Sequence, residues 1–258
     1  MYHEIYRPEA RQRLQRLTNP AYNTEISLFR EQMAFLSHSN VATLTIDELL
    51  NSDSSREGKT VCVTFDDGWL GNYLNVYPIL KEYELKATFF VAIDLIGKPL
   101  YMTWDQLREM QVSGMSVQSH TLSHRPLDNM EEQEILSELS ESKKIIEQKL
   151  GSLVRHLSLP HGYREPRIWI MAQEIGYQSI CTSDVGYARN VSLGPWLKRI
   201  SIGDNISDKQ FCLMVEGKYR GILRMMITKT LKNGLRRTIG VQRYRKLYQR
   251  VYGIRSAL

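Results

Sequence analysis

From residue 61 onward, short apolar runs alternate with helical patterns along the chain. The run at 61–65 is continuous and rich in β-branched residues, and helical spacing follows at 72–83. A continuous apolar run of this length is typical of a strand that is buried on both faces of a sheet. Strands that alternate with helices predict an α/β fold with a parallel sheet, either open or closed into a barrel.

The other expected elements continue this alternation. The clearest helical pattern is "MEEQEILSELSESKKIIEQKLG". Its apolar residues are expected on one stripe, and Gly151 is placed to end the helix. The stripe consists of Ile135, Leu139, Ile145, Ile146 and Leu150. Further helices are expected within 24–50 and at 104–113 and 167–175, and further strands at 87–93, 115–118, 155–159, 178–182 and 197–202.

The bulk composition limits the class of protein. A chain of 258 residues with 42% apolar content can bury a substantial core as one domain. No run of 18 apolar residues predicts a membrane span, and the charged start "MYHEIYRPEARQRLQRL" has no apolar signal region. The three widely spaced cysteines form neither a disulfide framework nor a CxxC zinc pattern. We therefore expect a cytoplasmic protein.

Two adjacent carboxylates, Asp66 and Asp67, directly follow the run at 61–65, in "TFDDG". In parallel sheets and barrels the functional groups gather at the carboxyl ends of strands, which is where this pair is expected. A turn or a helix cap is the alternative, and it is the one that the DDG tripeptide alone favours, because Asp and Gly are common in both.

Two histidines follow a second short strand. His120 and His124, in "QSHTLSHRPL", are four residues apart, so that on a helical turn both imidazoles face the same side. Two imidazoles and one carboxylate make a three-ligand set that leaves positions open for water and substrate, as in catalytic zinc sites. The two motifs together predict a metal site at the carboxyl ends of the strands.

With "TFDDG" and "HTLSH", the chain resembles the polysaccharide deacetylases, which are carbohydrate esterase family 4 and carry the NodB-homology domain. "LSLPHGY" stands where the family has its third motif, and the resemblance covers roughly residues 1–205. It implies an α/β fold of the distorted (β/α) barrel type. It also implies a hydrolase that removes N-acetyl groups from an N-acetylated sugar.

The resemblance also assigns roles to the motif residues. Asp67, His120 and His124 are implied to hold a divalent metal ion, while Asp66 is implied to be the general base for the metal-activated water. Such an ion can lower the pKa of water from about 16 to roughly 7, so that a nearby carboxylate suffices as the base. It also offsets the repulsion between two adjacent carboxylates. Zinc is the metal expected from these ligand types.

Two roles are less directly marked in the sequence. In the third motif the backbone amide of His161 is the implied oxyanion donor, and the motif's usual arginine is absent, which leaves open what orients Asp66. The resemblance to a branch with a permuted N-terminal Y-H motif assigns His3, in "MYHEI", as the general acid, with His161 as the alternative. His3 can also be an N-terminal histidine without a role. Arg199 is a weak match to the fourth motif.

Some other residues have structural and functional interpretations side by side. Aromatic side chains that can either stack on a sugar or belong to the core are Trp104, Tyr163 and Trp196. His38 and His156 are expected to be structural or exposed.

The chain divides by charge. From residue 206 to residue 258 there are 13 Lys or Arg and 2 acidic residues, a net charge of +11, whereas residues 1–205 carry −5. We therefore predict a catalytic domain at 1–205 and a basic, helical extension at 206–258. The extension is expected to contact an anionic membrane surface, with a solvated helix or a subunit contact as alternatives. Nucleic acid is not expected, because no recognition motif accompanies the charge.

Together these features predict a metal-dependent carbohydrate N-deacetylase, located in the cytoplasm or at the inner face of the membrane, whose substrate is a glycan or a lipid-linked saccharide. Alternatives on the same scaffold are a deformylase and an O-acetyl esterase. A metal-free imide hydrolase is disfavoured by the complete Asp-His-His set. A non-catalytic glycan-binding or membrane scaffold protein is the alternative from another class, and the presence of both Asp66 and Asp67 argues against it.

Overall fold

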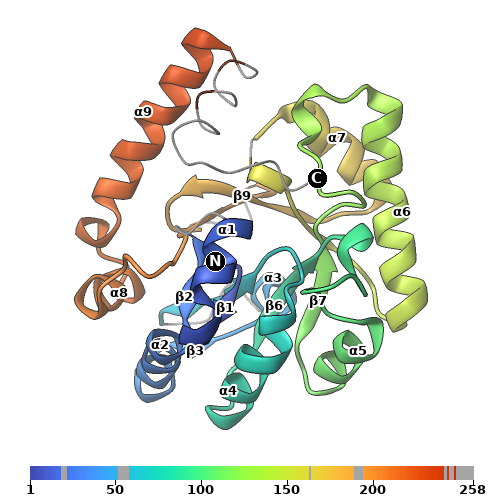
Figure 1. Cartoon of the computed structure of the whole chain (residues 1–258). Helices are drawn as coiled ribbons and strands as arrows, with labels where there is room; N and C mark the ends of the chain where they lie inside the picture. Colours follow the sequence, from blue (N-terminus) through green and yellow to red (C-terminus); the bar gives the residue numbers. More distant parts are fainter. Residues whose placement is uncertain are drawn as a thin grey trace.

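The computed structural model describes residues 1–18, 22–51, 58–162, 164–188 and 194–240, together with Arg243 and Leu247. Its centre is a curled, parallel, six-stranded sheet in which neighbours in sequence are also neighbours in space (Figure 1). The strands are β5 (Val63–Phe65), β6 (Ala87–Val91), β7 (Ser116–Ser119), β8 (His156–Ser158), β9 (Ser179–Val185) and β10 (Trp196–Arg199). The predicted α/β fold of the distorted (β/α) barrel type is confirmed.

Helices connect the strands and return the chain each time to the same end of the sheet. They are α4 (Tyr77–Glu82), α5 (Trp104–Val112), α6 (Glu132–Leu150) and α7 (Pro166–Ile175). All five residues of β6 are buried, and the rings of Phe65 and Phe89 stack 4.8 Å apart between neighbouring strands. Because every strand runs in the same direction, all carboxyl ends meet at one edge of the sheet.

The longest of these helices, α6, begins and ends as its sequence predicts. A capping box joins Glu131 and Glu134 at its start, and Gly151 takes a left-handed conformation with a φ of 70° at its end. Of the predicted stripe, Ile135, Leu139 and Ile146 are buried, whereas Ile145 and Leu150 are only half-buried. This helix covers the sheet next to β7, where it meets the loop that carries the two histidines.

The first residues of the chain lie in the gap between the two edge strands, β5 and β10. On one side Tyr2 pairs with Phe65, and its amide donates to the carbonyl of Thr64 at 2.8 Å. On the other side the amino group of Met1 donates to the carbonyl of Ile200 at 2.9 Å, and the amide of Ile202 donates to the carbonyl of Met1. The N-terminal segment therefore closes the curled sheet.

Smaller elements surround this closure. β1 (Ile5–Tyr6) pairs with β2 (Thr24–Glu25), and β3 (Ala42–Thr43) pairs with β4 (Thr60–Val61). The helices in this part are α1 (Arg11–Leu17), α2 (Ile26–His38) and α3 (Ile46–Asn51). The single strand predicted at 61–65 is divided at Cys62, since β4 pairs with β3 while β5 joins the large sheet.

The helix predicted at 72–83 also differs in detail. It begins as a π-helix at Asn72–Val76 and continues as α4. The side-chain amides of Asn72 and Asn75 donate to the backbone carbonyls of His3 and Ile5, both at 2.8 Å. The wider turn thus faces the N-terminal segment and holds it against the sheet.

The C-terminal part begins with α8 (Asp208–Val215) and continues with α9 (Leu223–Ile239). α8 buries Phe211 and Met214 in the main core cluster, where Phe211 meets the ring of Phe35 at 6.1 Å. α9 lies at the periphery of the molecule (Figure 1). The domain boundary between residues 205 and 206 stays a prediction, but α8 shares the core of the preceding residues. Among the described helices, none has the length and apolarity to cross a membrane.

Candidate active site

The predicted metal ligands come together at the carboxyl edge of the sheet. Asp67 follows β5, and His120 and His124 follow β7. One carboxylate oxygen of Asp67, Oδ1, lies 3.2 Å from Nε2 of His120 and 3.0 Å from Nε2 of His124. The three donor atoms lie within 4.8 Å of one another, a spacing at which all of them can reach a single ion.

The partners of these side chains suit a metal ion. Nδ1 of His120 lies 2.7 Å from the carbonyl of Ser158 and can donate to it, which leaves the lone pair of Nε2 directed at Asp67. The indole of Trp69 donates to the other carboxylate oxygen of Asp67 at 3.0 Å. Two imidazole nitrogens around a carboxylate oxygen form a donor set that a zinc-like ion prefers. The residues present therefore fit such an ion.

The electrostatics of this cluster also favour the ionised carboxylate. Burial alone would raise the pKa of Asp67, but the charge of His124 and the hydrogen bonds of His120 and His124 hold this pKa well below its usual range. Burial likewise lowers the pKa of His124, yet the carboxylate of Asp67 outweighs it and the net shift is upward. The site is thus organised around a fixed negative charge.

The other aspartate, Asp66, is held by Arg199 from the opposite edge of the sheet. The guanidinium donates from Nη1 and Nη2 to the two carboxylate oxygens, both at 2.7 Å. The hydroxyl of Ser158 donates to Asp66 at 3.1 Å and accepts from Arg199 at 2.8 Å. Asp66 is therefore fixed by a buried, bidentate ion pair. Arg199 and Ser158 are the residues that orient this carboxylate, which the sequence left open.

The same ion pair keeps Asp66 ionised. Burial alone would raise the pKa of this carboxyl, but the charge of Arg199, followed by that of His120, lowers the pKa to about 2. At neutral pH Asp66 is thus a carboxylate, the form that can accept a proton.

The loop that carries both histidines is anchored from α6. The amides of Leu122 and Ser123 donate to Oε2 of Glu138 at 2.9 Å each, and the hydroxyl of Ser123 donates to Oε1. Glu138 is buried on the inner side of the helix. An acidic residue at a position on the core-facing side of the predicted helix is the sequence signal that could have marked this anchor.

Backbone strain is concentrated at this edge of the sheet. Six non-glycine residues in the described part of the chain have a positive φ, and four of them are site residues or direct neighbours of the ligands: Asp67, Thr121, His124 and His161. A left-handed conformation costs a non-glycine residue roughly 1–2 kcal/mol. Strain of this kind persists where the surrounding structure fixes the side chains for a function.

His3 lies next to the two aspartates, because the amide of Asp66 donates to the carbonyl of the preceding residue, Tyr2, at 3.1 Å. Its ring stacks on Tyr22 with the ring centres 4.6 Å apart, and its Nδ1 is buried without a hydrogen-bond partner among the described residues. Burial lowers the pKa of His3, while the charges of Asp67 and Asp66 oppose that shift. Buried polar atoms without a partner are rare in proteins, so this one beside the site calls for a functional explanation.

His161 lies in the tight turn Pro160–Gly162 after β8, with a φ of 62°. Its ring centre is 6.2 Å from that of His124, and its side chain is exposed. Its carbonyl accepts a hydrogen bond from Ser183 at 3.0 Å. At Gly162, where φ is +68°, an added Cβ would come within 2.3 Å of the backbone nitrogen of Ser183, so the turn is packed tightly onto β9.

The remaining predicted residues do not join the metal cluster. His156 is buried between Asp47 and Ser179, and His38 is exposed at the end of α2, so that both have the expected structural or exposed character. Trp104 packs against the core, and Trp196 lies under Arg164, with 5.0 Å from the guanidinium carbon to the ring centre. Tyr163 lies outside the described residues.

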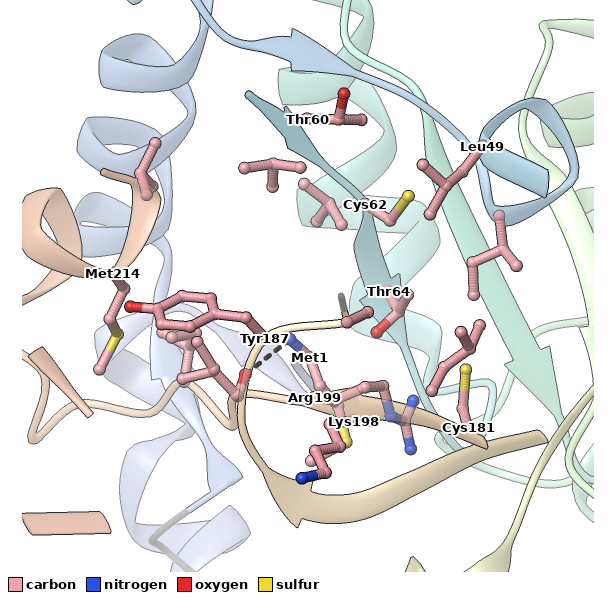
Figure 2. A pocket seen from close by; sticks show the side chains of 18 of the residues that line it. Met1, Leu49, Thr60, Cys62, Thr64, Cys181, Tyr187, Lys198, Arg199 and Met214 are labelled. Carbon is pink, nitrogen blue, oxygen red and sulfur yellow. Dashed lines mark hydrogen bonds between the residues drawn. The ribbon is translucent and has the colours of Figure 1, made fainter. Parts of the chain in front are cut away.

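A separate cavity of about 400 Å³ lies beneath the closure of the sheet (Figure 2). Met1, Thr64, Cys181 and Arg199 are among the residues that line it. Of these lining residues, only Arg199 belongs to the cluster at the carboxyl edge. Arg199 therefore contacts both places, since its side chain lines the cavity and its guanidinium holds Asp66.

A curled parallel sheet with two aspartates and two histidines at its carboxyl edge defines a hydrolase, and comparison with known proteins identifies its family. Residues 53–180 match the polysaccharide deacetylase family model. YxkH of Bacillus subtilis (strain 168), which is named after the same family, is 32% identical over 191 residues, or 73% of this chain and 68% of YxkH. The chain belongs to the polysaccharide deacetylase family.

Solved structures agree with this assignment. The deacetylase PplD of Streptococcus pyogenes, solved in complex with acetate, has a TM-score of 0.73 and 28% identity, covering 83% of this chain and 95% of PplD. IcaB of Ammonifex degensii shares the fold, with a TM-score of 0.69 at 21% identity over 83% of this chain and 95% of IcaB.

A further relative acts on an N-acetylated sugar according to its name. The peptidoglycan-N-acetylglucosamine deacetylase of Bacillus cereus is 29% identical over 128 residues, which are 48% of this chain and 57% of that protein. The chain thus spans little more than half of this relative. The predicted enzyme class, a carbohydrate N-deacetylase that hydrolyses amide bonds, is confirmed.

Proposed function

We propose that this protein uses a divalent metal ion to remove the N-acetyl group from an N-acetylated sugar in a glycan or a lipid-linked saccharide. The observation that carries the proposal is the pair of neighbouring aspartates with separate partners. Asp67 faces two imidazoles, whereas Asp66 is fixed as a carboxylate by Arg199. One aspartate is thus arranged to hold an ion and the other to accept a proton.

Each residue then has one task in the hydrolysis. Asp67, His120 and His124 would hold the ion, which when bound supplies a Lewis acid for the water and the acetyl carbonyl. Asp66 accepts the proton of the attacking water, and the amide of His161 donates to the oxyanion. His3 donates a proton to the leaving nitrogen, with His161 as the alternative donor. The carbon–nitrogen bond breaks, and the products are acetate and a free amine.

The nature of the substrate rests on the relatives. The Bacillus cereus relative is named for peptidoglycan N-acetylglucosamine, and one from Staphylococcus aureus is named for poly-β-1,6-N-acetyl-D-glucosamine. The latter is 26% identical over 159 residues, which are 55% of this chain and 54% of that protein. We therefore propose an N-acetylated hexosamine as the reacting sugar, and zinc as the metal.

A substrate panel tests this function. We expect the zinc-loaded protein to release acetate and expose an amine on β-1,4- or β-1,6-linked N-acetylglucosamine oligomers, with about one ion bound per chain by mass spectrometry. Chelation should remove the activity and zinc should restore it, because the ion supplies the Lewis acid. Faster turnover of O-acetylated or N-formylated sugars would instead identify an esterase or a deformylase. Metal binding without turnover of any acylated sugar would support a scaffold.

We also propose that the protein works in the cytoplasm, at the inner face of the membrane. All three cysteines are free thiols, as a reducing compartment requires, and the C-terminal segment carries the net positive charge that an anionic leaflet attracts. Cell fractionation tests this location. We expect the protein in the membrane fraction, released into the soluble fraction by high salt. Recovery of the protein on the outer side of the cytoplasmic membrane would contradict the proposal.

A further inference from the structure

The side of α9 that faces solvent is apolar. Leu223, Ile227, Leu231 and Leu235 are spaced by four residues and are exposed by 53%, 52%, 69% and 44%. Positions four apart lie on the same side of a helix, so these side chains form one stripe, called here the α9 stripe. Its two ends are twelve positions apart, which corresponds to about 18 Å of helix. The rest of this side consists of small residues and one cation: Arg224, Thr228, Thr230, Gly234 and Thr238.

The basic side chains of α9 lie mostly on its other side. Lys229 donates to the hydroxyl of Ser183, and Arg236 pairs with Asp128, both at 2.7 Å. These polar contacts fix the helix to the body of the protein, and at its start Met225 and Met226 also pack against the main core cluster. The four aliphatic side chains of the stripe are directed outward. A surface helix of a globular protein normally has the reverse arrangement, with its apolar stripe toward the core. An exposed apolar stripe of this length marks an interaction surface.

The charge around the α9 stripe selects the kind of partner. Between residues 216 and 240 there are seven Lys or Arg and one acidic residue, a net charge of +6. A second copy would bring two such segments together and place like charges against each other. The net positive charge of this segment attracts an anionic surface instead. The charge complementarity therefore favours a negatively charged partner over self-association.

The chemistry of the stripe distinguishes a lipid surface from an acidic protein. Its four members are all aliphatic, and it contains no aromatic residue, whereas the central contacts of protein interfaces are enriched in Trp, Tyr and Arg. Aliphatic side chains beside basic residues on one helix are the pattern of an amphipathic helix that lies in the plane of a membrane. α9 also lies at the periphery of the molecule, where a flat surface can reach it (Figure 1).

We propose that the α9 stripe inserts into the headgroup region of an anionic membrane and so holds the deacetylase domain at that surface. This deepens the proposed location at the membrane by naming the contact surface, and it does not depend on catalysis. Arg220 and Arg224, which are exposed near the start of the stripe, attract the anionic lipids, and the four aliphatic side chains enter the boundary between headgroups and acyl chains.

Vesicle co-sedimentation of the full chain, without substrate, tests the proposal. We expect binding to vesicles that contain phosphatidylglycerol and little binding to vesicles of phosphatidylcholine alone. The double variant I227S/L231S is expected to lower the binding at least about tenfold, because two aliphatic side chains no longer enter the lipid. High salt should weaken the binding of the wild type, because it screens the attraction to the lipids.

A matched control distinguishes binding by the α9 stripe from nonspecific adsorption of exposed apolar side chains to lipid. The double variant V112S/I170S removes two exposed aliphatic side chains of other helices, 85% and 59% exposed, and is expected to bind as the wild type does. Both double variants should keep the wild-type circular dichroism and thermal midpoint, since neither changes the core. Turnover of a soluble oligosaccharide should also stay the same, so that a failure of membrane binding is distinguished from a failure of the enzyme.

Three results would overturn the proposal. The first is absence of binding to phosphatidylglycerol vesicles at low salt. The second is equal binding by the I227S/L231S variant and the wild type. The third is a dimer in light scattering that the same variant dissociates while vesicle binding is unchanged, which would assign the α9 stripe to self-association.

Discussion

Replacing Asp66 with asparagine is expected to reduce the rate of deacetylation about 10³-fold while the protein keeps its metal. Asparagine has nearly the same shape, and its carbonyl oxygen at the position of Oδ2 can still accept from Nη2 of Arg199 and from Ser158, while the bond from Nη1 of Arg199 is lost. It cannot accept the proton of the attacking water, and general-base catalysis is worth roughly 10²–10⁴-fold. The three proposed ligands are unchanged. Steady-state kinetics and metal analysis of the same sample measure both quantities.

The surface variant D105N is the control for this change. Asp105 pairs with Arg108 on the exposed side of α5, so the same chemical replacement there should leave the rate and the metal content unaltered. If D66N turned over the substrate at the wild-type rate, Asp66 would not be the base. The division of labour between the two aspartates would then be wrong.

Replacing Arg199 with methionine is expected to lower the free energy of unfolding by about 3–5 kcal/mol. The change removes one partner of a buried ion pair and leaves the carboxylate of Asp66 buried without its bidentate donor. Methionine has a similar length and fills most of the space, so the effect is mainly electrostatic. Urea unfolding at neutral pH, where Asp66 is ionised, measures it.

The same variant should change the pH dependence in a defined direction. In the folded protein the pKa of Asp66 is lowered to about 2, below the ordinary value of about 3.9 for an unfolded chain. The ion pair therefore stabilises the wild type above about pH 4, and this contribution is lost as the pH falls toward 2. Without Arg199 burial dominates and the pKa of Asp66 rises. The acid limb of kcat/KM should thus move to higher pH.

Two further variants make this test specific. R199K keeps a positive charge but not the forked geometry, so its stability and its acid limb are expected to lie between those of the wild type and R199M. K198M removes the exposed neighbouring charge on the same strand and should change the stability by less than about 0.5 kcal/mol. Equal stability and an unchanged acid limb in R199M would show that Asp66 does not depend on Arg199.

The regular elements could largely be predicted from the sequence because their signals are local. The α6 helix carries its start, its apolar face and its terminal Gly151 within one stretch of chain. The alternation of strands and helices likewise leaves few topologies once all strands run parallel. The division of the predicted strand at Cys62 was not predictable, since it depends on which partner strand, β3 or β6, lies beside each half.

The site was predictable where its residues occur in short motifs. Asp67, His120 and His124 belong to two such motifs, and the structure brings them together. Arg199, Ser158 and Glu138 act on those residues from elsewhere in the chain, and the Arg199–Asp66 pair spans 133 positions. Spacing carries no information about such a pair, because only the closed sheet brings its two edges together.

The closure of the sheet by the N-terminal segment determines when during synthesis the active site can form. Met1 hydrogen-bonds with Ile200, 199 positions further along the chain. Asp66 forms its ion pair with Arg199, which lies 133 positions further along. Residues 1 and 2 therefore leave the ribosome well before β10 and gain these contacts only after that strand has emerged. Contacts over such distances also make folding slow. A nascent chain that has not yet extended past β10 holds the aspartates and histidines but lacks the guanidinium that orients Asp66, the proposed base. We therefore expect catalytic activity only when nearly the whole domain has been translated.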